Sequence, residues 1–278
     1  MTPTVVVLAI AITVIGLLIG RPLWRARQRR RLRAQPMPDA WRSDIERAMP
    51  IYACIPLPLR ARLDGLVQQF VAEKEFVGCR GLEVTLPMKL AVAAQACLLV
   101  LGRSARLYED LYSILIYPAA FLVPEEHRDE AGVVHQHERA LAGQAWDTHR
   151  IILSWDDVIA GAAAPDDGFN VVYHEFAHYL DAEAGIVNGA PFLGEARNYE
   201  RWSRVMQHEF AKLREADARG EPTVLDPYGA ENPGEFFAVA TEAFFELPRE
   251  LQTEHAELYG ELRNYFRLDP ASWLPHPA

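Results

Sequence analysis

The sequence predicts an α+β domain, a small sheet followed by helices, behind an N-terminal transmembrane helix. Three observations lead to this prediction. An uncharged apolar run lies near the N-terminus, short β-branched and aromatic runs occur between residues 113 and 155, and the chain after Trp155 has helical periodicity. The composition, 50% hydrophobic and 24% charged over 278 residues, excludes a disordered or low-complexity protein.

Residues 1–24 form the predicted transmembrane anchor. Residues 5–20 read VVVLAIAITVIGLLIG, and with the residues up to Trp24 they make about 20 residues, or about 30 Å of helix, which matches one bilayer core. Seven arginines follow before the first acidic residue: Arg21, Arg25, Arg27, Arg29, Arg30, Arg31 and Arg33. A cleaved signal peptide would carry its basic residues before the apolar run. We therefore expect a single-pass protein of the bacterial inner membrane, with the Arg flank on anionic head groups and the body in the cytoplasm.

The rest of the chain is acidic. The seven arginines are a quarter of the 28 basic residues, so the other 21 stand against 38 acidic ones. Such a body binds nucleic acid poorly, and we expect no direct nucleic-acid partner. Cys54, Cys79 and Cys97 lack the spacing of a disulfide framework or a metal site, which indicates a reducing compartment.

The predicted elements follow in chain order. Residues 25–56 read as a basic flank and a Pro-rich linker with one short helix over 39–48, and the folded domain spans 57–278. A helix over 59–70, a short strand over 81–85 and a buried helix over 88–101 come first. The runs SILIYP, AFLVP, GVVHQH and RIILSW predict a small sheet. Helices are expected over 169–184, 199–213, 233–246 and 248–266.

The chemistry of the sequence lies in an HExxH motif, His174-Glu175-Phe176-Ala177-His178, within a predicted helix. Histidines four residues apart share one helix face and aim two imidazole nitrogens at one point, as a tetrahedral zinc ion requires. Glu175 then lies beside the metal as a general base. The alternative is an amphipathic helix with two satisfied histidines.

A catalytic zinc site needs a third protein ligand. No third His stands where an HExxHxxGxxH motif would have it, and the segment NPGEFFAVATEAFFEL offers Glu235 and Glu242. These are seven residues apart and hence nearly on one helix face. Glu235 also fits a capping box behind Asn232. Spacing alone leaves both glutamates open as the third ligand.

Four separated stretches, SILIYPAAFLV, HEFAHYLD, LDPYGAENPGEFFAV and TEAFFELP, resemble the MtfA (Mlc titration factor A) family of zinc peptidases, and the likeness runs from about Ile51 to the C-terminus. The resemblance implies a zincin-like domain, a Zn²⁺ cofactor, and a peptide or protein substrate. It implies His174, His178 and Glu235 as ligands and Glu175 as the base. It also associates His135, in the segment VVHQ, with the metal site as a fourth ligand; the alternative is a histidine on an exposed strand.

Tyr228 lies seven residues before Glu235 in the loop LDPYGAENP. The resemblance to lethal-factor-like zincins implies that its hydroxyl donates to the developing oxyanion, and the alternative is a packing residue in a Pro-bounded turn. The expected function is that of a membrane-anchored zinc-dependent peptidase of the HExxH plus Glu type. The alternative is a binding protein of the same fold that sequesters a transcriptional regulator.

Overall fold

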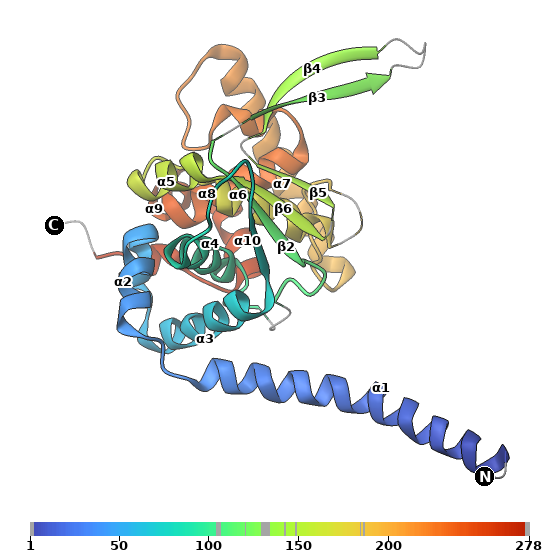
Figure 1. Ribbon diagram of the computed structural model, residues 1–278. Helices are drawn as coiled ribbons and strands as arrows, with labels where there is room; N and C mark the ends of the chain where they lie inside the picture. The colour runs from blue at the N-terminus through green and yellow to red at the C-terminus, as the bar shows by residue number, and fades with distance from the viewer. Residues whose placement is uncertain are drawn as a thin grey trace.

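The computed structural model describes residues 3–103, 107–119, 121–128, 134–141, 143–147, 149–183, 185 and 187–275, and between 5 and 19 and between 121 and 147 it describes the backbone alone. The described chain is mostly helical with a small sheet (Figure 1). The predicted fold class, an α+β domain behind a transmembrane helix, is therefore wrong. Helices outweigh the sheet because two of the expected strands lie outside it and because part of the expected linker is helical.

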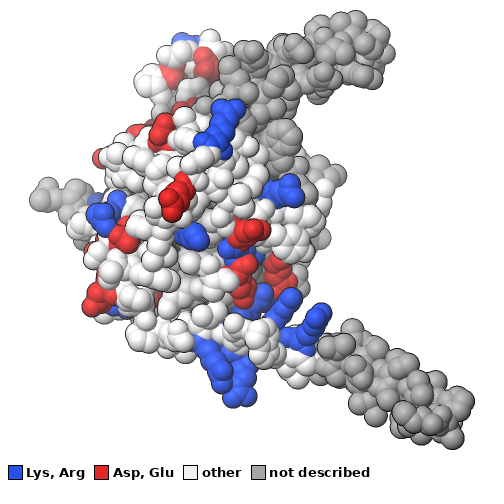
Figure 2. Space-filling view, in the orientation of Figure 1, with Lys and Arg blue, Asp and Glu red and all other residues white. Residues whose placement is uncertain are grey.

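Helix α1 (Pro3–Ala34) runs without a break from the apolar residues into the arginines, and it packs on α3 (Leu57–Glu73). Arg29 Nε donates to Glu73 Oε1 at 2.7 Å, and Arg33 Nε donates to Gln69 Oε1 at 2.5 Å. Lys and Arg side chains gather where α1 meets the body (Figure 2). The arginines that we expected on lipid head groups therefore include two that bind another helix of the same chain.

Across the described residues, none of the helices is both long and apolar enough to span a bilayer. The predicted anchor at residues 1–24 and the predicted single-pass location in the inner membrane are therefore wrong. The sequence pattern misled because an apolar run followed by basic residues is typical of a membrane anchor. The same pattern here belongs to one long helix whose basic end contacts α3.

Much of the expected linker is folded onto the core. Helix α2 (Asp39–Ala48) matches the predicted short helix, and the 3-10 helix η1 (Pro50–Cys54) follows it. Ile45 and Tyr52 from these two elements are fully buried. Pro38 and Pro56 are the N-caps of α2 and α3, and Pro50 stands in the first turn of η1, where the N–H that Pro lacks would be unpaired.

The main sheet has four strands in the order β1-β2-β6-β5. The first three run parallel and the last is antiparallel to its neighbour: β1 (Glu75–Gly78), β2 (Ser113–Tyr117), β6 (Arg150–Ser154) and β5 (Gly143–Asp147). The predicted strand over 81–85 is wrong, because the residues that pair with β2 are those of β1. Strands β3 (Phe121–Arg128) and β4 (Val134–Leu141) pair with each other in a separate ribbon that projects from the body (Figure 1).

The helix with the HExxH motif, α6 (Val171–Ala182), packs between α4 (Leu86–Leu99) and α8 (Pro233–Glu246). Phe176 of α6 is fully buried, and its ring centroid lies 4.9 Å from that of Tyr108 and 6.0 Å from that of Phe70. Burial of one such ring stabilises the fold by about 2–3 kcal/mol. Because Phe176 points into the core, the opposite face of α6, which carries the histidines, turns toward α8.

The remaining helices form the C-terminal part of the fold. They are α5 (Trp155–Ala163), α7 (Ala196–Arg219), the 3-10 helix η2 (Pro227–Ala230), α9 (Pro248–Glu254), α10 (Ala256–Phe266) and η3 (Pro270–Ser272). The single helix predicted over 248–266 is interrupted at His255, whose Nδ1 lies 2.6 Å from Glu209 Oε2 on α7. This contact ties the break between α9 and α10 to α7.

Candidate metal centre

Helix α6 begins at a strong cap, which fixes the position of the HExxH motif. The side chain of Asn170 accepts hydrogen bonds from the N–H groups of Val172 and Tyr173, both at 3.1 Å. One turn later, His174 and His178 lie on the same face, with ring centroids 4.8 Å apart. The two imidazoles therefore converge, as their spacing in the sequence predicts.

Helix α8 supplies a carboxylate to the same point. Asn232 caps α8 by accepting from the N–H groups of Gly234 and Glu235, and Pro233 occupies the first turn. Oε2 of Glu235 lies 3.0 Å from Nε2 of His174 and 3.2 Å from Nε2 of His178. The carboxylate at the third position of α8 thus faces the histidines of α6.

Glu242 lies on the other side of His174. Nδ1 of His174 donates to Oε1 of Glu242 at 2.6 Å, and the N–H of Asn170 donates to the other oxygen of Glu242. The Glu242 side chain is almost fully buried. Spacing left Glu235 and Glu242 as equal candidates for the third ligand, and the structure gives them different neighbours. Glu235 lies beside the Nε2 atoms of both histidines, and Glu242 orients the imidazole of His174 through its Nδ1.

The donor cluster fits a metal ion. His174, His178 and Glu235 each offer one ligand atom, and these atoms lie within 4.8 Å of one another. Ligand atoms around a tetrahedral zinc ion, with bonds of about 2.0–2.1 Å, lie about 3.3 Å apart. The three separations here are 3.0, 3.1 and 3.2 Å. Two neutral imidazoles and one carboxylate are also a donor set that zinc prefers.

Glu175 is buried beside this cluster with only 3% of its surface exposed, and its Oε2 has no hydrogen-bond partner within the described structure. Burial raises the pKa of Glu175 to about 7, although the nearby His174 and His178 oppose the rise. A carboxylate with this pKa exchanges a proton near neutral pH.

The charges of the cluster are coupled. Burial by itself lowers the pKa of His174, but hydrogen bonds to Glu235 and Glu242 outweigh it and raise the pKa to about 10. Burial likewise acts to raise the pKa of Glu235, and the hydrogen bonds with both histidines hold it well below its ordinary value. The cluster thus attracts one positive charge, either a proton or a metal ion.

Tyr228 lies at the edge of the cluster. It sits in η2, with its ring centroid 6.0 Å from that of His174 and 46% of its surface exposed. Its backbone N–H donates to Asp226 Oδ1 at 2.7 Å, which fixes the turn. The structure therefore brings Tyr228 to the same site as the HExxH motif, as the loop sequence predicts.

One predicted site residue, His135, and one acid close to the motif, Asp181, remain to be placed. His135 pairs through its backbone with His127 in the β3-β4 ribbon, and its side chain lies outside the described residues. Asp181, one turn after His178, accepts from the N–H of Gly189 at 2.6 Å and so holds the loop after α6. Sequence reasoning missed Asn170, although an Asn directly before an apolar helical run is a recognisable cap.

The chain matches a family model described as glucose-regulated metallo-peptidase M90 over residues 23–267. An uncharacterized protein from a Synechocystis species is 39% identical over 271 residues, which cover 97% of this chain and 98% of the relative. Proteins named Mlc titration factor A from Yersinia pestis and Yersinia pseudotuberculosis are each 32% identical over 229 residues, covering 81% of this chain and 84% of each relative.

Proposed function

Because this chain belongs to the glucose-regulated metallo-peptidase family M90, we propose that it hydrolyses peptide bonds at a zinc ion held by His174, His178 and Glu235. The convergence of their donor atoms at 3.0–3.2 Å supports this ligand set. A peptidase acts on peptides or proteins, so the substrate class follows from the family. A zinc ion at this position supplies Lewis acidity toward water and toward the peptide carbonyl.

The observation that carries the proposal is the buried, unpaired carboxylate oxygen of Glu175 beside the three donors. In the proposed mechanism, Glu175 takes a proton from the attacking water and later passes it to the leaving amine. Burial favours the protonated form of Glu175, which supports its uptake of the proton from water.

Two other residues have proposed supporting roles. Glu242 accepts from Nδ1 of His174, which leaves Nε2 as the nitrogen that would bind a metal ion. Tyr228, with its ring 6.0 Å from that of His174, donates its hydroxyl proton to the oxyanion of the tetrahedral intermediate.

The second candidate function is a binding protein that sequesters a transcriptional regulator. The observation that favours it is the name of the Yersinia relatives, Mlc titration factor A. Glu175 favours the peptidase, since a binding protein gains nothing from a buried carboxylate with an unpaired oxygen beside a metal site. The two functions are separable by experiment.

The test combines metal analysis with digestion of a peptide library. We expect one zinc ion per chain in the wild type, and loss of both zinc and hydrolysis in His174→Ala and His178→Ala. His208→Ala, which removes an exposed histidine from α7, is the matched control and should retain both. His135→Ala should keep the stoichiometry and weaken the affinity if His135 adds a fourth ligand. Stoichiometric zinc in both motif variants would overturn the proposed site, and zinc without any cleavage would favour the binding protein.

A further inference from the structure

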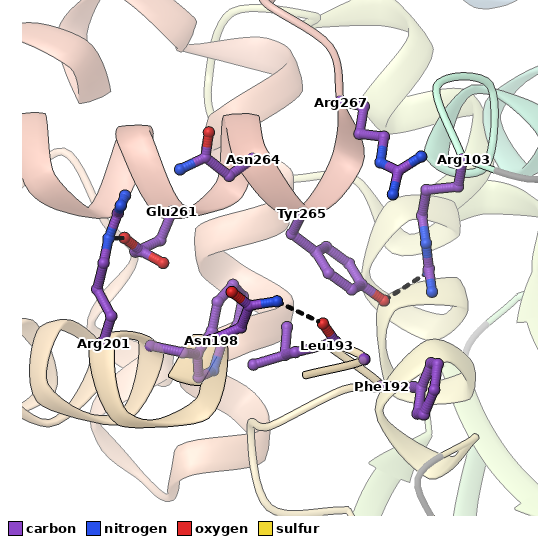
Figure 3. A pocket seen from close by; sticks show the side chains of 11 residues that line it. Arg103, Phe192, Leu193, Asn198, Arg201, Glu261, Asn264, Tyr265 and Arg267 are labelled. Carbon is purple, nitrogen blue, oxygen red and sulfur yellow. Dashed lines mark hydrogen bonds and ion pairs between the residues drawn. The ribbon is translucent and has the colours of Figure 1, made fainter. Parts of the chain in front are cut away.

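A cavity of about 340 Å³ lies between α7, α10 and the loop that precedes α7. Figure 3 shows the side chains that line it, which come from these elements and from the turn after α4. None of the proposed zinc ligands lines this cavity. Its volume is in the range of pockets that hold small molecules.

The charge of the lining is strongly biased. Three arginines, Arg103, Arg201 and Arg267, face a single acidic residue of the lining, Glu261. Glu261 is already bound by Arg201 through a hydrogen bond from Nε. The cavity therefore keeps an excess of positive charge, although the chain as a whole has a formal net charge of -10. Because acidic residues outnumber basic ones in the chain, three arginines beside one glutamate are a local feature of this cavity.

The other two arginines have few partners for their charge. Arg103 donates from Nη1 to the hydroxyl of Tyr265 at 2.6 Å, and its guanidinium lies over the Tyr265 ring, 4.4 Å from the centroid. Arg103 Nη2 also lies 4.0 Å from Oε2 of Glu183, an acid outside the lining. No hydrogen bond or ion pair to another described residue engages the guanidinium of Arg267. Figure 3 shows Arg103 and Arg267 on the same side of the cavity, with Arg103 reaching the Tyr265 hydroxyl.

The backbone is arranged to bring these two arginines together. A Cβ on Gly102 would lie 2.2 Å from the carbonyl oxygen of Phe266 and 2.6 Å from that of Arg267, so only glycine permits this approach. Arg267 itself caps α10 in the left-handed conformation, with φ of 54°. Glycine is the favoured residue there, because a side chain at this φ approaches the backbone too closely. The chain nevertheless places a guanidinium at the cavity.

The opposite wall is held in place by hydrogen bonds from α7. Trp202 Nε1 donates to the carbonyl of Gly189 at 2.8 Å, and Asn198 Nδ2 donates to the carbonyl of Leu193 at 2.9 Å. The N–H of Leu193 donates in turn to the hydroxyl of Tyr199 at 3.0 Å. A wall fixed in this way loses little conformational entropy when a ligand binds.

We propose that this cavity binds a small organic anion, whose phosphate or carboxylate group lies between Arg103 and Arg267. Guanidinium groups match both oxyanions with paired, charge-assisted hydrogen bonds. An oxyanion there would be attracted by both positive charges. The remaining part of the ligand lies against Phe192 and Trp202, which line the same space. The proposal does not depend on the peptidase activity.

The test is a calorimetric titration of the full chain with inorganic phosphate and, separately, with glutarate, at an ionic strength held constant with chloride. Arg267→Gly is the decisive variant, because glycine suits the left-handed backbone and the variant should be at least as stable as the wild type. We expect saturable binding of at least one anion to the wild type, weakened about tenfold or more in Arg267→Gly. Arg103→Gln should weaken it similarly. Arg204→Gln, an exposed arginine on α7 outside the cavity, is the control for net charge and should bind as the wild type does.

The two ligands separate the two sources of the oxyanion. Binding of phosphate alone points to a phosphorylated compound, and binding of glutarate alone points to a carboxylate. Absence of saturable binding of both anions would overturn the proposal. Equal affinities in Arg267→Gly and Arg204→Gln would also overturn it, since the anion would then bind elsewhere, including at the metal centre.

Discussion

His174 and Glu242 form a hydrogen bond of 2.6 Å between Nδ1 and Oε1, on the side of the imidazole that faces away from Glu235. A neutral imidazole has one N–H, and Glu242 engages it at Nδ1. In that neutral form Nε2 would offer its lone pair to a metal ion held between His174, His178 and Glu235. The hydrogen bond between His174 and Glu242 thus favours the tautomer of His174 that a metal ligand needs.

This relationship predicts different consequences for the two glutamates. Glu242→Gln should weaken zinc binding by about 10- to 100-fold, because it removes the charge that orients His174. Glu235→Gln should weaken it further, since it removes a proposed ligand. A competition titration against a chelator measures both, with Glu250→Gln, an exposed acid on α9, as the control. Full affinity in Glu235→Gln together with loss in Glu242→Gln would reverse the assignment.

Glu246 predicts a pH dependence of stability. Burial raises its pKa from 4.5 to about 9, with a hydrogen bond from Asn170 opposing the rise. Because the folded-state pKa is the higher one, the folded chain holds a proton that the unfolded chain releases between these values. The contribution of this group to the free energy of unfolding therefore falls as pH rises through that window. Glu246→Gln carries no such proton and should lose less stability between pH 6 and pH 8.5, by about 3 kcal/mol.

Urea unfolding at the two pH values measures this difference. Glu250→Gln removes the same charge from an exposed position and should keep the wild-type pH dependence. Parallel behaviour of Glu246→Gln and the wild type would mean that Glu246 is ionised in the folded protein at neutral pH.

Tyr228→Phe tests the role of the phenol. The substitution keeps the ring next to His174 and deletes only the hydroxyl. If the hydroxyl donates to the oxyanion, turnover should fall about 10²-fold, or about 3 kcal/mol, with unchanged zinc content and melting temperature. Normal turnover in this variant would assign Tyr228 to packing.

The parts of the site that the sequence predicted are those set by local geometry. His174 and His178 converge because four residues make one turn of a helix, and this holds wherever the helix lies. The choice between Glu235 and Glu242 was open because both lie on the face of α8 that turns to α6. Which carboxylate meets Nε2 and which meets Nδ1 depends on how two helices dock, and spacing along one helix carries no such information.

The errors in the fold have the same origin. Hydropathy identified an apolar run next to the arginines and so predicted a membrane anchor. The partners of Arg29 and Arg33 are Glu73 and Gln69, about 40 positions away in the chain, and hydropathy does not predict such contacts. Proline was taken as a sign of a linker, whereas Pro38 and Pro50 stand at the starts of α2 and η1. Tyr52, which lies in η1, is fully buried, and this burial depends on how the helices pack against one another.

The central claim is that Glu175 is the general base of a zinc peptidase, and the turnover of Glu175→Gln tests it most directly. Glutamine is nearly isosteric and cannot accept the proton, so the variant should keep one zinc ion per chain and its melting temperature. Its rate of peptide cleavage should fall by about 10²-fold or more. Turnover equal to that of the wild type, with zinc bound, would contradict the proposed mechanism.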